Sequence, residues 1–144
     1  MDIEPVDTDV RALIDAWLDA VRVRDVPRIM ACYAPDVRAF DAVGKLQFRG
    51  RDAYGEHWQA CMTMCNGTMI FEIDELEIAA DASLALVHYV CRCGAVMEDG
   101  EEKSGWMRAT VACSKASGRW LITHDHFSAP FDPETCNALF DRNA

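Results

Sequence analysis

The residues with the clearest chemical potential lie in one stretch near the end of the chain, Trp120 to Pro130, which contains two histidines two positions apart. Its composition predicts a β-strand, and residues two apart in a strand share a face of the sheet. One face is then expected to carry Trp120, Ile122, His124, His126 and Ser128. Because this face begins apolar and becomes polar, the strand is expected to leave a packed core and enter a partly solvated cavity.

Four roles are open for His124 and His126. Imidazole titrates near neutral pH, so either ring could act as a general base or hydrogen-bond donor in a pocket. A His-x-His pair on one strand face is also a spacing that binds metal ions. The rings could instead orient another group, such as Asp41, or each other. The fourth role is structural, with each ring held by backbone or carboxylate groups. The cupin metal motif is excluded, because Pro130 and Phe131 occupy the positions where its glutamate would stand. We therefore predict neither a metal nor another cofactor.

Asp41 is a carboxylate in the otherwise apolar stretch 37–43. A carboxylate that faces an apolar cavity has a raised pKa and can act as a base near neutral pH. Alternatively, Asp41 faces solvent or caps backbone amides near Gly44. The spacing alone leaves both possibilities open.

Arg108 lies between Trp106 and Thr110 in a further predicted strand. If its side chain faces the cavity, the guanidinium can bind a carboxylate or an enolate through charge-assisted hydrogen bonds. The alternative is an ion pair across the sheet with Glu72 or Asp74.

The periodicity of apolar residues predicts the elements that must position these groups. Helices are expected at 7–23, 26–33 and 52–65, and strands at 37–43, 46–48, 68–80, 83–93, 104–115 and 120–128, followed by a short terminal helix from Asp132. Helices and strands are segregated along the chain, which is typical of the α+β class. We predict a single domain, 1–144, in which a strongly curved antiparallel sheet forms a cone around three helices and holds a ligand on its concave side.

The composition restricts the partners. The net charge of −10 argues against binding to nucleic acid or to an anionic membrane surface. No run reaches the roughly 18 apolar residues that a transmembrane helix requires. The acidic N-terminus is unlike a secretion signal, so we expect a cytoplasmic protein. The seven cysteines are an odd number, which disfavours a disulfide framework and predicts mostly buried thiols.

The element order, together with Tyr33-Ala-Pro-Asp36 and the closing stretch Gly118 to Pro130, resembles the SnoaL-like branch of the nuclear transport factor 2-like (NTF2-like) superfamily. This superfamily has a cystatin-like fold and includes ketosteroid isomerases, polyketide cyclases, limonene epoxide hydrolases and dehydratases. The resemblance implies an α+β cone, commonly a homodimer, with an apolar pocket between the sheet and the helices.

The segment Tyr33 to Gly44 also resembles the part of ketosteroid isomerases that carries the general base, and the match implies that Asp41 is the base. The pattern departs from those enzymes elsewhere. The oxyanion-binding tyrosine would fall near Trp17, and the strand of the second acid contains Arg108 but no carboxylate. The base is therefore implied by the resemblance, whereas the oxyanion hole is not.

The sequence thus predicts a cofactor-independent isomerase, cyclase or dehydratase acting on a small apolar, carbonyl-bearing compound. The alternative is a non-catalytic ligand-binding or oligomerisation module of the same fold, and in either case we expect a homodimer through the outer face of the sheet. The expected catalytic residues are Asp41, His124, His126 and Arg108, and the expected substrate-binding residues are Trp17, Tyr33, Trp58, Trp106 and His88.

Overall fold

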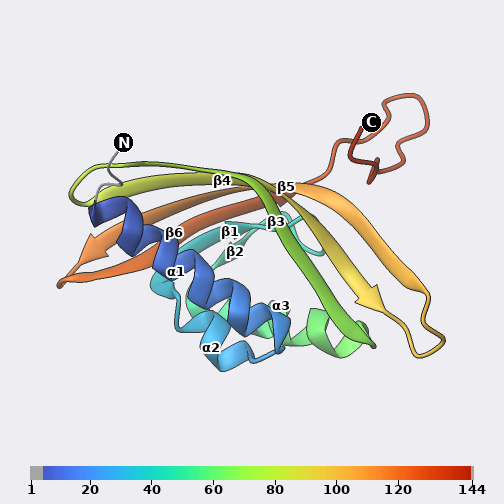
Figure 1. Ribbon diagram of the computed structural model, residues 1–144, viewed down its shortest axis with the longest axis horizontal. Coiled ribbons are helices and arrows are strands. Elements are labelled where there is room, and N and C mark those ends of the chain that lie inside the picture. The colour runs from blue at the N-terminus through green and yellow to red at the C-terminus, as the bar shows by residue number, and fades with distance from the viewer. Residues whose placement is uncertain (1–4, 144) are drawn as a thin grey trace.

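A computed structural model describes residues 5–143 of the chain. One curved sheet of six strands carries all the helices on its concave side, and Figure 1 shows this two-layer arrangement. The helices are α1 (Pro5–Arg22), α2 (Val26–Met30) and α3 (Arg51–Met64); the strands are β1 (Tyr33–Phe40), β2 (Phe48–Arg49), β3 (Thr68–Ala80), β4 (Leu84–Val96), β5 (Glu102–Ala116) and β6 (Arg119–Ser128). The predicted α+β class is confirmed. No helix within 5–143 is long and apolar enough to span a bilayer.

The helices form for local reasons that the sequence makes visible. The apolar stripe of α1 includes Val10, Ile14 and Trp17, all of which are buried against the sheet. Asp25 caps α2 by accepting a hydrogen bond from the backbone of Arg28 at 3.1 Å. The prediction that this helix continues to residue 33 is wrong, because Tyr33 already begins β1 and pairs with β6.

The strand order in the sheet is β2-β1-β6-β5-β4-β3. Strands β3 to β6 form an antiparallel meander, as expected, but β1 pairs with β6 in parallel, with Arg38 opposite His124. The prediction of a wholly antiparallel sheet is therefore wrong at this one pair. A parallel pair needs a long crossover connection, and α3 with the three intervening strands of the meander supplies it.

The β5–β6 pairing contains a bulge at Thr123. Cys113 is opposite Ile122, but the next partner pair is Ala112 and His124, so Thr123 is an extra residue on β6. Its hydroxyl donates to the carbonyl of Ala112 at 3.2 Å. Because one extra residue reverses which face the following side chains occupy, the residues after the bulge point to the opposite side from that expected by simple alternation.

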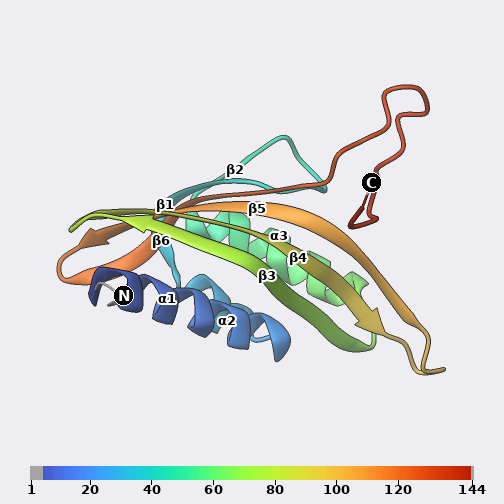
Figure 2. The same ribbon diagram turned by 45° about the horizontal axis from the view of Figure 1, so that its top comes forward.

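The turn between β5 and β6 was predicted correctly, whereas the segment after β6 was not. The β5–β6 turn has positive φ at Ser117 (53°) and Gly118 (76°), which confirms the predicted tight hairpin. The predicted terminal helix from Asp132 is wrong. Residues 129–143 run as turns and extended chain beyond the end of β6, with one bridge between Phe131 and Ala138 (Figure 2).

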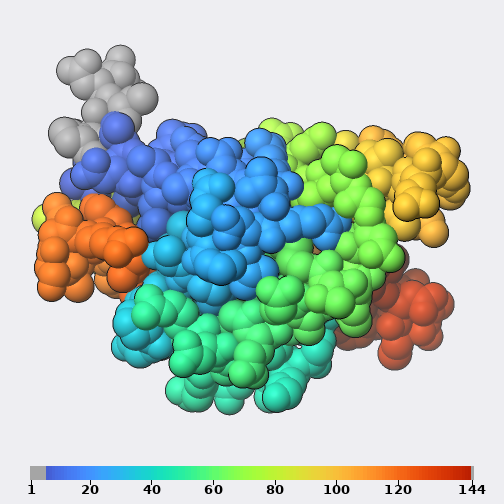
Figure 3. All heavy atoms as spheres, turned by 90° about the horizontal axis from the view of Figure 1, so that it is seen from below, coloured from blue at the N-terminus to red at the C-terminus, as the bar shows by residue number. Residues whose placement is uncertain are grey.

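The core lies between α1, α3 and the concave face of the sheet. Trp17 is at its centre, in edge-to-face contact with Phe71 (5.2 Å between ring centroids) and Trp58 (5.9 Å) and stacked on Phe127 (6.1 Å). Figure 3, viewed from the helix side, shows the helices covering the middle of the sheet while the β4–β5 and β5–β6 hairpins protrude at opposite ends. The middle of the concave side is therefore packed, and any solvated space lies nearer its rim.

Candidate functional site

A buried carboxylate, Asp125 on β6, lies at the centre of a hydrogen-bond network on the concave side of the sheet. Its side chain is 1% exposed. The Tyr33 hydroxyl donates to Oδ2 at 2.6 Å, and the Tyr54 hydroxyl donates to Oδ1 at 3.0 Å. Trp17 Nε1 in turn donates to the Tyr33 oxygen at 2.9 Å. The network thus joins α1, β1, α3 and β6 through polar groups that are satisfied inside the core.

Burial dominates the electrostatics of this network. It raises the pKa of Asp125 to about 7, against the lowering effect of the hydrogen bonds from Tyr33 and Tyr54, and the charge of Asp41 adds to the rise. Burial, followed by the proximity of Asp125, also holds the pKa values of both tyrosines well above their usual range. The two phenols therefore remain hydrogen-bond donors at neutral pH, and Asp125 can hold a proton there.

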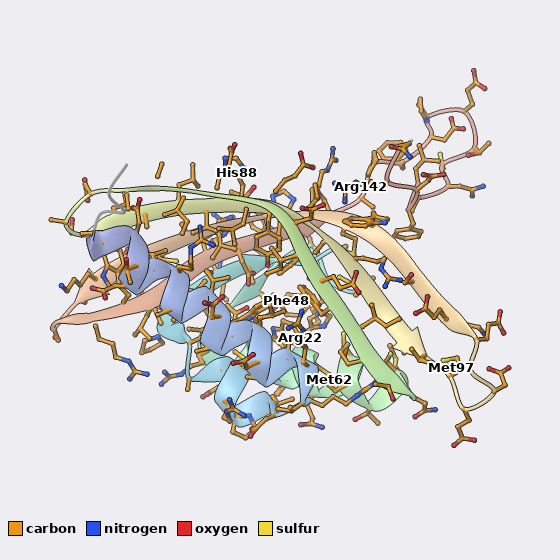
Figure 4. All side chains as sticks on the ribbon, in the orientation of Figure 1. Arg22, Phe48, Met62, His88, Met97 and Arg142 are labelled. Carbon is orange, nitrogen blue, oxygen red and sulfur yellow. The ribbon has the colours of Figure 1, made fainter. Side chains whose placement is uncertain are left out.

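A second polar group, nearer the surface, consists of Asp41 and His57. Asp41 follows β1, and its Oδ2 lies 2.5 Å from Nε2 of His57 on α3. Because an ionised carboxylate only accepts hydrogen bonds, Nε2 is the donor. Both side chains are mostly buried, with exposed fractions of 19% for Asp41 and 12% for His57. Phe48 stacks on the imidazole at 4.1 Å between ring centroids and fixes its orientation; Figure 4 shows Phe48 between the sheet and the helices.

The Asp125 network and the Asp41–His57 pair lie next to each other. The rings of Tyr54 and His57 lie nearly parallel, at 13° and 6.1 Å between centroids. The charge of Asp41 contributes to the raised pKa values of both Asp125 and Tyr54. A change in the charge of Asp41 therefore changes the pKa of the buried carboxylate of Asp125.

A hollow of about 430 Å³ opens beside Asp41 at the rim of the concave side. Its walls are largely apolar, with contributions from Met107, Phe127 and Phe140. A small apolar molecule in this hollow would meet one carboxylate.

The SnoaL-like domain family matches residues 10–132. The chain belongs to this family. No curated protein matches the SnoaL-like chain.

Solved structures agree with the family assignment. An NTF2-like protein of unknown function from Pseudomonas putida is 49% identical to this SnoaL-like chain, with a TM-score of 0.89 over 94% of each chain. A ketosteroid isomerase-like protein from Erwinia carotovora is 20% identical, with a TM-score of 0.73 over 88% of this chain and 97% of that one. An NTF2-like superfamily protein from Salmonella enterica is 17% identical, with a TM-score of 0.74 over 88% and 92%. The last two share the fold.

The SnoaL-like domain turns its two strand histidines away from the packed middle of the concave side, contrary to the prediction that they face it, but His126 still contributes to the wall of the hollow that Asp41 lines. His124 Nδ1 donates to the carbonyl of Arg38 at 2.5 Å, and His126 is exposed. Both rings contact Phe40 edge-to-face. The bulge at Thr123 is the physical reason, because it turns Asp125 and Phe127 inward instead.

Arg108 and His88 also lie on the outer face, contrary to the expectation that they line the ligand pocket. Arg108 Nε donates to Ser128 Oγ at 3.1 Å. His88 pairs with Glu77 at 3.3 Å, and Figure 4 shows it on the side of the sheet away from the helices. The neighbour of Arg108, Ala109, is buried, so alternation along β5 turns the guanidinium outward. These residues surround a separate hollow of about 660 Å³ on the outer face.

The four predicted aromatic pocket residues divide between the two faces. Trp106 is on the outer side, where the Arg142 guanidinium lies 4.3 Å from its ring centroid. Trp17 and Tyr33 are on the concave side but are fully packed. Trp58 is half-buried on α3, and its Nε1 is a buried donor that has no hydrogen-bond partner among the described residues.

Sequence reasoning missed His57, Tyr54, Cys61 and Asp125. A signal for the helical residues was present, because His57 follows Tyr54 by three positions and precedes Cys61 by four, which places them on one helix face. Asp125 carried no comparable signal, since an unrecognised bulge assigned it to the wrong side of its strand.

Proposed function

We propose that this SnoaL-like domain transfers a proton on a small, apolar, carbonyl-bearing molecule, as an isomerase, cyclase or dehydratase. The observation that carries the proposal is the Asp41–His57 pair at the apolar hollow, with 2.5 Å between Oδ2 and Nε2. A carboxylate fixed by a hydrogen bond next to an apolar space has the geometry of a positioned general base.

In this proposal Asp41 removes a proton from the carbon next to the carbonyl and returns it to another atom of the substrate. The imidazole of His57 holds the carboxylate in place through the hydrogen bond between Nε2 and Oδ2. Wall residues Met107, Phe127 and Phe140 exclude water around the reacting atoms.

The charge of the protein favours a neutral substrate. The net charge is −10, and the hollow itself contains the carboxylate of Asp41. An anionic ligand would be repelled by both, so ketones and enones are better candidates than carboxylic acids.

Exchange of substrate hydrogens in D2O tests the proposal directly. The purified protein is incubated with a panel of apolar ketones and enones, and deuterium incorporation next to the carbonyl is followed by NMR. At least one compound is expected to exchange faster with protein, and Asp41→Asn should slow that exchange by roughly 10²- to 10⁴-fold. Asp36→Asn is the matched control, because Asp36 is an exposed carboxylate on β1. Undiminished exchange in Asp41→Asn would contradict the proposal.

A specific observation favours a second function, the non-catalytic ligand-binding module. Trp17, Trp58 and Phe127 fill the middle of the concave side, which leaves room only near the rim. In that case thermal-shift measurements would detect a ligand in the hollow, while no compound in the panel would exchange deuterium above the uncatalysed rate.

We also propose a homodimer in the cytoplasm. Leu84 and Leu86 on the outer sheet face are 56% and 46% exposed, and an apolar dimer contact would cover them. The seven free cysteines suit a reducing compartment. Light scattering checks the dimer: Leu86→Glu is expected to give monomers, and a monomeric parent chain would contradict it.

A further inference from the structure

We propose that Asp41, His57 and Cys61 form a binding site for a divalent metal ion of borderline softness, such as Zn²⁺ or Co²⁺. Each residue offers one ligand atom, and the three atoms lie within 4.8 Å of one another. Imidazole nitrogen, thiolate sulfur and carboxylate oxygen are the ligands that zinc takes in proteins. This inference goes beyond the proposed proton transfer and does not depend on it.

Two elements build the site in advance of any ion. His57 and Cys61 are four residues apart on α3, so their side chains emerge one turn apart on the same face. Asp41 approaches from the segment after β1, where its Oδ1 accepts a hydrogen bond from the backbone of Ala42 at 2.9 Å. The three ligands thus need no rearrangement of secondary structure to converge.

The imidazole of His57 is held from both sides. Phe48 stacks on it, and Gly44 lies so close that a Cβ at that position would be 3.2 Å from His57 Cε1. The φ of Gly44 is +84°, which favours glycine and allows this close approach. A fixed ring keeps Nε2 aimed at Asp41 and near Cys61, and preorganisation of this kind strengthens metal binding.

The interatomic distances suit exchange of a proton for an ion. In a tetrahedral zinc site with bonds of about 2.0–2.3 Å, ligand atoms lie roughly 3.3–3.6 Å apart. His57 Nε2 and Cys61 Sγ are already 3.7 Å apart. His57 Nε2 and Asp41 Oδ2 are 2.5 Å apart, a hydrogen-bond distance, and they would separate by about 1 Å when the ion displaces the proton between them.

The charges balance. Binding of the ion releases the Cys61 thiol proton to solvent, and the His57 proton moves from Nε2 to Nδ1, so one thiolate and one carboxylate neutralise the divalent ion while the neutral imidazole adds no charge. Three protein ligands leave one position of a tetrahedron for water or an exchangeable ligand, and Asp41 also lines the hollow of about 430 Å³. Because the ion takes the carboxylate oxygen that the proposed base requires, metal binding and proton transfer at this site exclude each other.

Titration of the chelator-treated protein with Co²⁺ tests the site. We expect one Co²⁺ per chain, a thiolate-to-cobalt charge-transfer band, visible bands of tetrahedral intensity, and loss of all of these on addition of Zn²⁺. Cys61→Ser should abolish the charge-transfer band, and His57→Gln should weaken binding by at least about 100-fold, more than the loss of an outer-shell partner costs. Circular dichroism establishes that each variant is folded.

Two control variants test whether thiols other than Cys61 bind the metal ion. Cys65→Ser removes a half-buried thiol at the C-terminal cap of α3, one turn beyond Cys61. Cys93→Ser disrupts a rival pair, since Cys91 Sγ and Cys93 Sγ lie 3.6 Å apart. Both variants should keep the band. Absence of Co²⁺ binding at millimolar concentration, or loss of the band in Cys93→Ser but not in Cys61→Ser, overturns the proposal. The proton-transfer proposal is judged separately, by exchange in metal-free protein.

Discussion

The hydroxyl of Tyr33 lies 2.6 Å from the carboxylate of Asp125, although the two residues are 92 positions apart in the sequence. Tyr33 begins β1 and Asp125 lies in β6, so this contact spans the parallel strand pair that closes the chain into one sheet. A buried carboxylate between two phenols also supplies a group whose protonation is linked to the stability of the fold.

The pH dependence of unfolding should show the protonation of Asp125. Its pKa is about 7 in the fold against an ordinary value of 3.8, so between these values the folded state holds a proton that the unfolded state has released. The contribution of Asp125 to stability is therefore greatest at low pH and falls as pH rises from about 3.8, by at most about 1.4 kcal/mol per unit, until the group ionises near pH 7. Urea unfolding at pH 5, 6, 7 and 8 measures the slope.

The variant Asp125→Asn isolates this contribution, because an amide does not titrate. The charged and titratable groups around Asp125 are Tyr33, Tyr54, Tyr89, Cys113 and Asp41, and all of them remain in the variant. The difference in unfolding free energy between the parent and the variant should change by roughly 3 kcal/mol from pH 5 to pH 8. A constant difference would mean that Asp125 is ionised throughout this range.

Removal of the Tyr33 hydroxyl should be costly and pH-dependent. Tyr33→Phe leaves Asp125 Oδ2 without its donor and Trp17 Nε1 without its acceptor. Loss of a hydrogen bond to a buried group costs about 1–3 kcal/mol, and more when the group is charged. The destabilisation should therefore be larger at pH 8, where Asp125 is ionised, than at pH 5. Chemical denaturation at both values measures it.

Tyr89→Phe is the matched control for that prediction. Tyr89 is also buried on the concave side, but among residues 5–143 the donors to Asp125 are Tyr33 and Tyr54. Its effect on stability should be similar at pH 5 and pH 8. If Tyr33→Phe behaves like Tyr89→Phe at both pH values, the Tyr33 hydroxyl does not stabilise the carboxylate.

The sequence predicted the elements better than it predicted the directions of their side chains. The apolar stripe of α1 and the alternation of β3 identify their elements, because burial of one face imposes a periodicity. The parallel pairing of β1 with β6 has no such local signature, since pairing is decided by tertiary contacts. The inward direction of Asp125 could not be predicted, because it depends on one extra residue in β6, Thr123. Threonine is common in regular strands, so the sequence does not mark the bulge.

Deletion of Thr123 tests whether that residue is the extra one in β6. Without it, Ile122 and His124 become neighbours and keep their partners Cys113 and Ala112, so strict alternation from the buried Ile122 still turns Asp125 to the concave face. The phenols of Tyr33 and Tyr54 would keep their acceptor. We expect the deletion variant to retain cooperative unfolding, as followed by near-ultraviolet circular dichroism and urea titration.

The substitution Thr123→Ala is the control for the deletion. It keeps the residue count of β6 and removes only the hydroxyl that donates to Ala112 at 3.2 Å, so it should cost about 1 kcal/mol. If the deletion variant instead loses cooperative unfolding while Thr123→Ala keeps it, Thr123 is not a removable extra residue, and the register of β6 depends on it.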